Sequence, residues 1–183
     1  TTRSVAAFGL AGTDNGNFAA SVYTGRIEAG YIVATPLAEV TPFAAFEPSW
    51  IRLPNFDETA GAAGSLLFAL AYSGRTAASL PTSLGVQLDR TALLDNGWTL
   101  APYLRVAWVH EFDDTRSLTA NLLAAPGAGF TLTGTPASQD SALLTGSLKL
   151  TRTGMVSFYA NLTTDLSPHG QSLAANLTLV LNW

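Results

Sequence analysis

Residues 172–183 carry the pattern that decides the fold, and they read Ser-Leu-Ala-Ala-Asn-Leu-Thr-Leu-Val-Leu-Asn-Trp. Every second residue from Leu173 to Trp183 is apolar, and most residues between them are small or polar. A period of two places alternate side chains on opposite faces of a β-strand. This stretch is therefore predicted to be a strand with one apolar face and one polar face.

The same alternation recurs towards the N-terminus. It is clear in residues 154–163 and 98–112, and in residues 141–151, where only Leu143 interrupts the polar face. With weaker patterns included, ten strands are predicted, the others near residues 4–12, 18–33, 39–52, 64–76, 80–91 and 116–124. No competing stretch has the three- and four-residue apolar spacing of an amphipathic helix. The fold class is predicted to be all-β.

Composition limits the possible functions. A length of 183 residues suggests one domain over residues 1–183. The formal net charge of −4 offers no basic surface to nucleic acid, so no nucleic-acid partner is expected. The absence of cysteine excludes a disulfide framework and a thiol nucleophile. No metal-binding or phosphate-binding motif is present, so neither a metal nor a cofactor is expected.

The polar faces distinguish a soluble sheet from a membrane barrel. A soluble sheet normally exposes many Lys and Glu side chains, whereas only 12% of this chain is charged and Lys149 is its one lysine. Ser, Thr, Asn, Gln and Gly fill the polar faces instead, and these residues suit a confined lumen. The sequence therefore predicts an antiparallel up-and-down transmembrane β-barrel whose apolar side chains face lipid.

Connection lengths offer a second test, because outer-membrane barrels alternate short periplasmic turns with longer extracellular loops. We assign the C-terminal end of the final strand to the periplasm and count back from there. The predicted periplasmic turns are then residues 152–154, 113–116, 77–79 and 34–38. The predicted extracellular loops are residues 164–171, 125–139, 92–97, 53–63 and 13–17, most of them longer.

Several motifs in the second half of the chain occur in a familiar order. They are Pro102-Tyr-Leu-Arg-Val-Ala-Trp-Val-His-Glu-Phe112, Ala125-Pro-Gly-Ala-Gly-Phe130, Gly134-Thr-Pro136, Asp140-Ser-Ala142 and the strand that ends in Trp183. Over about the last 90 residues, this succession resembles the C-terminal translocator barrel of the autotransporter family.

The resemblance implies a barrel of twelve strands in the outer membrane of a Gram-negative bacterium. Such a barrel takes part in type V secretion and helps to carry its own N-terminal passenger segment to the cell surface. Its implied partners are the lipid bilayer, the outer-membrane insertion machinery and the passenger. Because ten strands are predicted and no passenger is found, two expectations stay open: the N-terminal part of the domain is absent from this chain, or the chain is a complete smaller barrel without the secretion role.

Six charged residues at mid-strand positions are predicted to face the lumen: Arg26, Glu28, Asp89, Arg105, Glu111 and Lys149. They form either a wall that contacts a passenger, a plug or an ion, or internal salt bridges that keep a small barrel rigid. Arg105 is the foremost candidate.

The final strand also resembles the signal by which outer-membrane proteins are recognised for insertion. The residues of this predicted signal are Leu177, Leu179, Leu181 and Trp183. The alternative is an ordinary edge strand that closes the barrel, and both interpretations can hold together.

Two other function classes stay open at this point. A small pore or structural barrel would need no further residues. An omptin-like or lipase-like barrel enzyme would need His with acidic or Ser partners at the extracellular rim. Only His110 and His169 are available, His110 falls on the predicted periplasmic side, and no Gly-x-Ser-x-Gly motif occurs. We therefore expect no catalytic residues.

Overall fold

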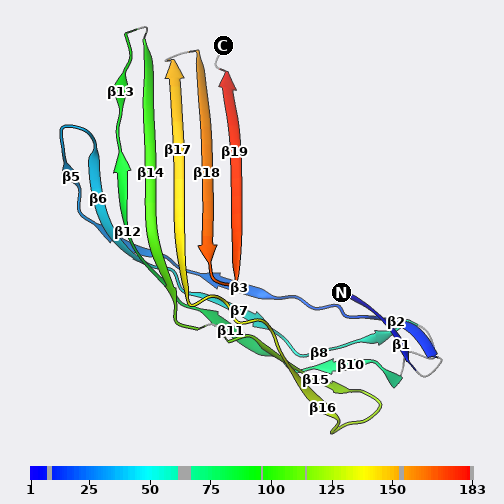
Figure 1. Cartoon of the computed structure of the whole chain (residues 1–183). Coiled ribbons are helices and arrows are strands. Elements are labelled where there is room, and N and C mark those ends of the chain that lie inside the picture. The colour runs from blue at the N-terminus through cyan, green and yellow to red at the C-terminus, as the bar shows by residue number, and fades with distance from the viewer. Residues whose placement is uncertain (8–9, 62–66, 96, 114, 153–154, 182–183) are drawn as a thin grey trace. The chain divides into compact units, whose positions relative to one another are not determined.

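The computed structural model describes residues 1–7, 10–61, 67–95, 97–113, 115–152 and 155–181, and it is built almost entirely of antiparallel strands (Figure 1). The chain forms two compact units. Unit 1 comprises Thr1–Gly25, Pro48–Ser79 and Asp114–Ala137, and unit 2 comprises Arg26–Glu47, Leu80–Asp113 and Ser138–Trp183. Within the described ranges, no helix has the length and apolar character needed to cross a bilayer.

Unit 2 is a nine-stranded sheet in which β19, β18, β17, β14, β12, β6 and β4 lie side by side in that order, with β13 beside β14 and β5 beside β6 (Figure 1). The bounds are β4 Ile27–Gly30, β5 Val33–Ala34, β6 Glu39–Phe46, β12 Pro81–Asp89, β13 Ala92–Leu93, β14 Trp98–Glu111, β17 Asp140–Arg152, β18 Val156–Ser167 and β19 Gly170–Leu181. Its longest strands are the segments with the clearest alternation in the sequence.

Unit 1 contains three smaller antiparallel sheets, ordered β1-β2-β9, β16-β15-β10-β8 and β11-β7-β3. Its strands are short, with bounds β1 Thr2–Ala7, β2 Leu10–Asn15, β3 Ser21–Thr24, β7 Ser49–Leu53, β8 Phe56–Asp57, β9 Thr59–Ala60, β10 Leu70–Tyr72, β11 Arg75–Ser79, β15 Ser117–Leu122 and β16 Gly129–Thr133.

The hairpin turn predicted at residues 113–116 is wrong, because β14 pairs with β17 and not with β15. His110 pairs with Asp140. Ser117, seven residues after His110, pairs with Thr133, which is seven residues before Asp140. The two ladders therefore have the same offset in residue number. The apolar alternation ends at Phe112, which favours a turn, but a strand that does not face lipid needs no apolar alternation.

The predicted turn at residues 77–79 is wrong for the same reason. Residues 77–79 lie within β11, where Ser79 pairs with Ser49, and β12 pairs with β6 and not with β11. The separate strands expected at 64–76 and 80–91 are in fact β10 and then the β11–β12 run, and residues 62–66 lie outside the described ranges.

The connections within unit 2 differ in length between the two ends of its sheet. At the end where β19 finishes, neighbouring strands are joined through residues 35–38, 90–97 and 153–155. The predicted loop at 92–97 therefore lies at the same end as the predicted turns at 34–38 and 152–154, and its extracellular assignment is wrong. At the opposite end the chain leaves for the long segments 47–80 and 112–139, whereas β18 and β19 are joined there by residues 168–169 alone.

The nine-stranded sheet has two distinct faces. One row of cross-strand partners runs through Leu173, Thr164, Leu144, Val106 and Val86. We call this side, with Leu177 and Trp108 at other rows, the apolar face. The next row runs through Ser172, Asp165, Leu143, Ala107, Gly85 and Phe43, and we call this side the polar face.

The buried hydrophobic residues of unit 2 lie on the polar face and not on the apolar face. Phe43, Ala45 and Ala107 form a small buried cluster, and Leu143 packs against it. This contact explains why Leu143 interrupts the polar alternation of its strand. The large apolar side chains on the other face are exposed, as Leu177 at 86% and Leu173 at 71% show.

Candidate functional site

Arg105 lies at the centre of a hydrogen-bonded network on the polar face. Its Nη1 and Nη2 donate to Oε1 and Oε2 of Glu28 at 3.0 and 2.7 Å. Nη1 also donates to Oε1 of Gln87 at 3.2 Å. Arg105 is on β14 and Glu28 is on β4, so this bidentate pair reaches across β12 and β6. Two parallel hydrogen bonds fix the orientation of both side chains.

Glu28 binds a second arginine as well. Arg26 donates to Glu28 through Nη2 and to Glu47 through Nη1. Two arginines and two glutamates therefore form a group without net charge. We call Arg26, Glu28, Glu47 and Arg105 the charge quartet.

The other predicted lumen charges also lie on the polar face, but they are outside the quartet. Asp89 accepts a hydrogen bond from Nε2 of Gln87 at 2.7 Å, which links it to Arg105 through Gln87. Glu111 accepts from the backbone N–H of Leu80 at 2.6 Å. Lys149 lies 5.4 Å from the ring centre of Tyr159. The structure thus brings Arg26, Glu28 and Arg105 together and leaves Glu111 and Lys149 elsewhere.

Glu47, Gln87 and Phe43 were missed by sequence reasoning. Glu47 and Phe43 share the parity of Glu39 in the 39–52 stretch, so strict alternation would have placed them on the polar face. Pro42 and Pro48 obscured that register. The guanidinium carbon of Arg105 lies 3.6 Å from the ring centre of Phe43, a cation–π contact that no local pattern reveals.

The apolar face has the dimensions of a lipid-facing belt. Strand β17 bears Asp140 at one end and Arg152 at the other, with Leu144, Leu148 and Leu150 between them on this face. Thirteen residues at about 3.3 Å each span roughly 40 Å, which at a tilt of about 45° rises roughly 28 Å. The apolar band of an outer-membrane barrel is about 25 Å tall.

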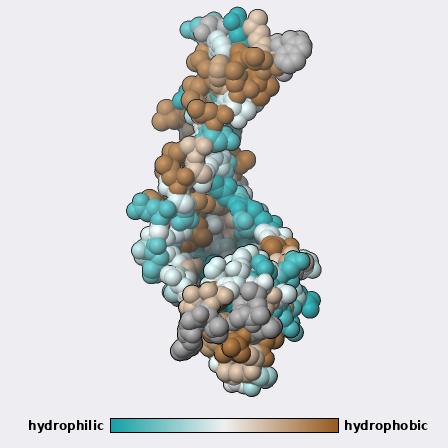
Figure 2. All heavy atoms as spheres, turned by 90° about the vertical axis from the view of Figure 1, so that its right-hand side faces the viewer, coloured by the Kyte–Doolittle hydropathy of each residue, from teal (hydrophilic) through white to brown (hydrophobic). Residues whose placement is uncertain are grey.

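Hydrophobic surface gathers over the upper part of the molecule in Figure 2, which is seen from the β19 side of the sheet. Leu177, Leu179 and Leu181 lie on β19, which is the edge strand of the sheet, and all three are exposed. Trp183 lies outside the described residues. An apolar cavity of 320 Å³ lies beside Ala160, between Leu148 and Leu177.

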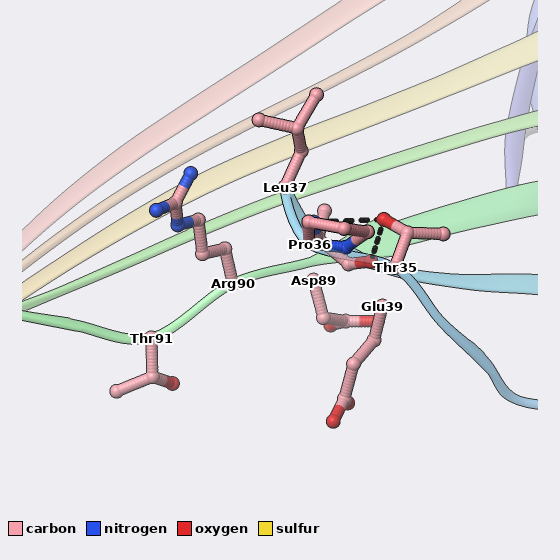
Figure 3. Close-up of a pocket in the computed structure, with 8 residues that line it drawn as sticks. Thr35, Pro36, Leu37, Glu39, Asp89, Arg90 and Thr91 are labelled. Atoms are coloured by element: carbon pink, nitrogen blue, oxygen red, sulfur yellow. Dashed lines mark hydrogen bonds between the residues drawn. The ribbon is translucent and has the colours of Figure 1, made fainter.

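A second cavity, of 390 Å³, lies at the turn end of unit 2 between residues 35–39 and 89–91 (Figure 3). Thr35 closes the turn by donating from Oγ1 to the carbonyl of Ala38 at 2.6 Å. Glu39 and Asp89 are cross-strand partners, and Figure 3 shows both side chains directed away from the guanidinium of Arg90. Two carboxylates make this end of the polar face acidic.

Unit 1 contains a separate buried charge cluster. Arg3 donates to Asp14 and Glu58 through Nη2, and to Glu58 through Nε at 3.0 Å. Glu58 also accepts from the backbone N–H of Leu70 at 3.0 Å and from the hydroxyl of Tyr72 at 3.2 Å. Asp14 is fully buried. These contacts connect two of the three segments of unit 1, Thr1–Gly25 and Pro48–Ser79.

The two histidines have different partners. Nδ1 of His110 lies 2.9 Å from Oδ1 of Asp140, and Nδ1 of His169 lies 3.0 Å from Oγ of Ser138. The hydrogen-bond partner of His169 is therefore a serine hydroxyl and not a carboxylate. His110 is also at the end of the sheet opposite the end of β19, so its predicted periplasmic position is wrong.

These observations describe an antiparallel sheet with an exposed apolar belt on one face and paired charges on the other. A model of the autotransporter beta-domain family matches residues 1–163 of the 183-residue chain. The chain belongs to the autotransporter beta-domain family. No curated protein matches it.

This autotransporter beta-domain is therefore an outer-membrane β-barrel of a Gram-negative bacterium, as its sequence resemblance implies. It is a translocator domain of type V secretion, a class that associates with the membrane and with a passenger segment and is generally not catalytic. The matched range begins at residue 1, so it includes the N-terminal half, in which the sequence motifs were weak.

Proposed function

We propose that this autotransporter domain anchors an N-terminal passenger in the outer membrane and helps to export it, with the nine-stranded sheet of unit 2 as barrel wall and its polar face as lumen lining. The observation that carries the proposal is the opposition of the two faces. Leu177 and Leu173 are exposed on the apolar face, whereas the quartet balances its charges on the polar face. An extended polypeptide can pass such a wall without meeting an unpaired arginine.

The test uses the complete natural reading frame, expressed in a Gram-negative host with an epitope tag in the polypeptide that precedes this domain. We expect protease added to intact cells to remove the tag. Deletion of residues 170–183 should abolish this surface exposure. Faster gel migration of the domain before boiling than after boiling shows that the barrel is folded. A tag that stays protected from protease in cells with such a folded barrel would refute export by it.

We further propose that the insertion machinery recognises the final strand through Leu177, Leu179, Leu181 and Trp183. The exposed edge position of β19 supports this role, because an unpaired edge can add a partner strand. Leu179→Asp should slow the appearance of the heat-modifiable form in pulse-labelled cells, and Asn176→Ser should leave its rate unchanged. Equal rates for the two variants would refute this signal.

A further inference from the structure

Three aromatic side chains lie in a row on the apolar face where β14 ends. Trp108, His110 and Phe112 occupy alternate positions, so they point to the same side of the strand. The ring centres of Trp108 and His110 are 5.6 Å apart, and those of His110 and Phe112 are 4.7 Å apart. Trp108 and Phe112 are 48% and 66% exposed, so this row offers open ring surface.

Asp140 on the neighbouring strand β17 holds the row in place. Its Oδ1 accepts a hydrogen bond from Nε1 of Trp108 at 2.9 Å and lies 2.9 Å from Nδ1 of His110. The side chain of Asp140 is itself 56% exposed. Within the described part of the chain, its Oδ2 has no hydrogen-bond partner and is available to an external donor.

The row lies at the extracellular border of the lipid belt. The long segments 47–80 and 112–139 leave unit 2 at this end of the sheet, and long connections are extracellular in outer-membrane barrels. The row is also continuous with the apolar face that contacts lipid. The molecules at this border are the head groups of the outer leaflet, which in a Gram-negative outer membrane are those of a glycolipid.

We propose that Trp108, His110, Phe112 and Asp140 form a contact site for the saccharide head group of the outer-leaflet glycolipid. The C–H bonds of a sugar ring carry partial positive charge and stack on the electron-rich face of an aromatic ring. Sugar hydroxyls donate to the free carboxylate oxygen of Asp140. The site contains one carboxylate and neither Arg nor Lys, so a phosphate group by itself is a poor match.

The test titrates the purified domain, folded in non-ionic detergent micelles, with lipopolysaccharide that lacks O-antigen, and measures the dissociation constant. Trp108→Leu and Asp140→Ala should each weaken binding roughly two- to tenfold. The matched control is Trp98→Leu, at the other end of the same strand and on the same face, which should bind as the wild type does. Phosphatidylglycerol, an anionic lipid without the saccharide, should bind all four proteins equally.

Heat-modifiable gel migration confirms that each variant is folded. If Trp108→Leu does not fold, the dissociation constant of Asp140→Ala for lipopolysaccharide tests the proposal by itself. Wild-type affinity in the Asp140 variant, or an equal loss in Trp98→Leu, would overturn the proposal. A parallel loss of phosphatidylglycerol binding would show that the row recognises a phosphate and would overturn it as well. This inference rests on the proposed function only in that the apolar face points outward to lipid. Export of the passenger is measured in a separate experiment, so glycolipid binding can fail while export is observed, and export can fail while binding is observed.

Discussion

Gly85 provides the space that Phe43 occupies on the polar face. A Cβ atom at position 85 would lie 2.7 Å from Cζ of Phe43 and still closer to the carbonyl oxygen of Val106. We expect Gly85→Ala to lower the free energy of unfolding by about 1–3 kcal/mol, because the ring and the ladder must shift. Urea titration in detergent micelles measures this loss.

The control for this substitution is Gly146→Ala on β17, where a Cβ atom would meet nothing within 4 Å. Its free energy of unfolding should stay within about 0.5 kcal/mol of the wild type. Equal losses at the two positions would show that Phe43 does not pack on Gly85.

Arg105 and Glu28 should be energetically coupled, because they form the bidentate pair at the centre of the quartet. In a double-mutant cycle, the loss of unfolding free energy in the Arg105→Ala, Glu28→Ala double variant should differ by about 0.5–3 kcal/mol from the sum of the losses in the two single variants. Arg105→Ala with Lys149→Ala is the control cycle, since Lys149 is outside the quartet. Additive losses in the first cycle would contradict the pair.

At the scale of the strand, β19 tests which face meets lipid. Leu177→Arg should lower the free energy of unfolding in lipid vesicles by about 2–4 kcal/mol if this side chain lies near the bilayer midplane. Asn176→Ser, the adjacent residue on the opposite face, should change it little. Similar sensitivity at both positions would mean that the two faces have been assigned incorrectly.

The hairpin formed by β15 and β16 can be tested with cysteines, because the chain has none of its own. Thr119 and Thr131 are cross-strand partners whose Oγ1 atoms lie 3.1 Å apart. A double variant with cysteine at these positions should form a disulfide on mild oxidation, as seen by a gel shift that reductant reverses. Thr119 paired with Leu132, the neighbour of Thr131 whose side chain points to the opposite face, should not cross-link, and equal cross-linking of both pairs would contradict this register.

At the scale of the whole molecule, the two units differ in their charge clusters, and unit 1 should respond to acid through Glu58. Burial raises the pKa of the Glu58 carboxyl, but hydrogen bonds from Arg3, Leu70 and Tyr72 together with the charge of Arg3 hold that pKa below its ordinary value of 4.5. A pKa that folding lowers contributes stability above its unfolded value, and this contribution is lost as the pH falls through the folded value.

Unfolding free energies should therefore fall between about pH 6 and pH 3 by more in the wild type than in Glu58→Gln, which has no carboxyl to protonate at this position. Urea titrations at the two pH values provide the comparison. The same pH dependence in both proteins would show that Glu58 contributes nothing to it.

The sequence was most informative where one strand face meets lipid. Between Asp140 and Leu181 the alternation gave the strands and faces that the structure contains. It failed at residues 77–79 and 113–116, where counting back from the final strand predicts turns but the strands on either side do not pair with each other. Hairpin pairing there depends on backbone hydrogen bonds, which any residue except proline can make, so side-chain polarity carries no signal.

The sequence by itself determined the all-β class, the family and the two faces of the best strands, because burial in lipid demands apolar side chains at every second position. Only the tertiary structure decided which charges meet. Arg105 and Glu28 are 77 residues apart, and their contact exists because β12 and β6 set the spacing between β14 and β4. A period of two in the sequence shows on which face of the strand a side chain lies. Which side chains lie beside it on that face depends on the register between strands, and register is a property of a pair of strands and not of one strand alone.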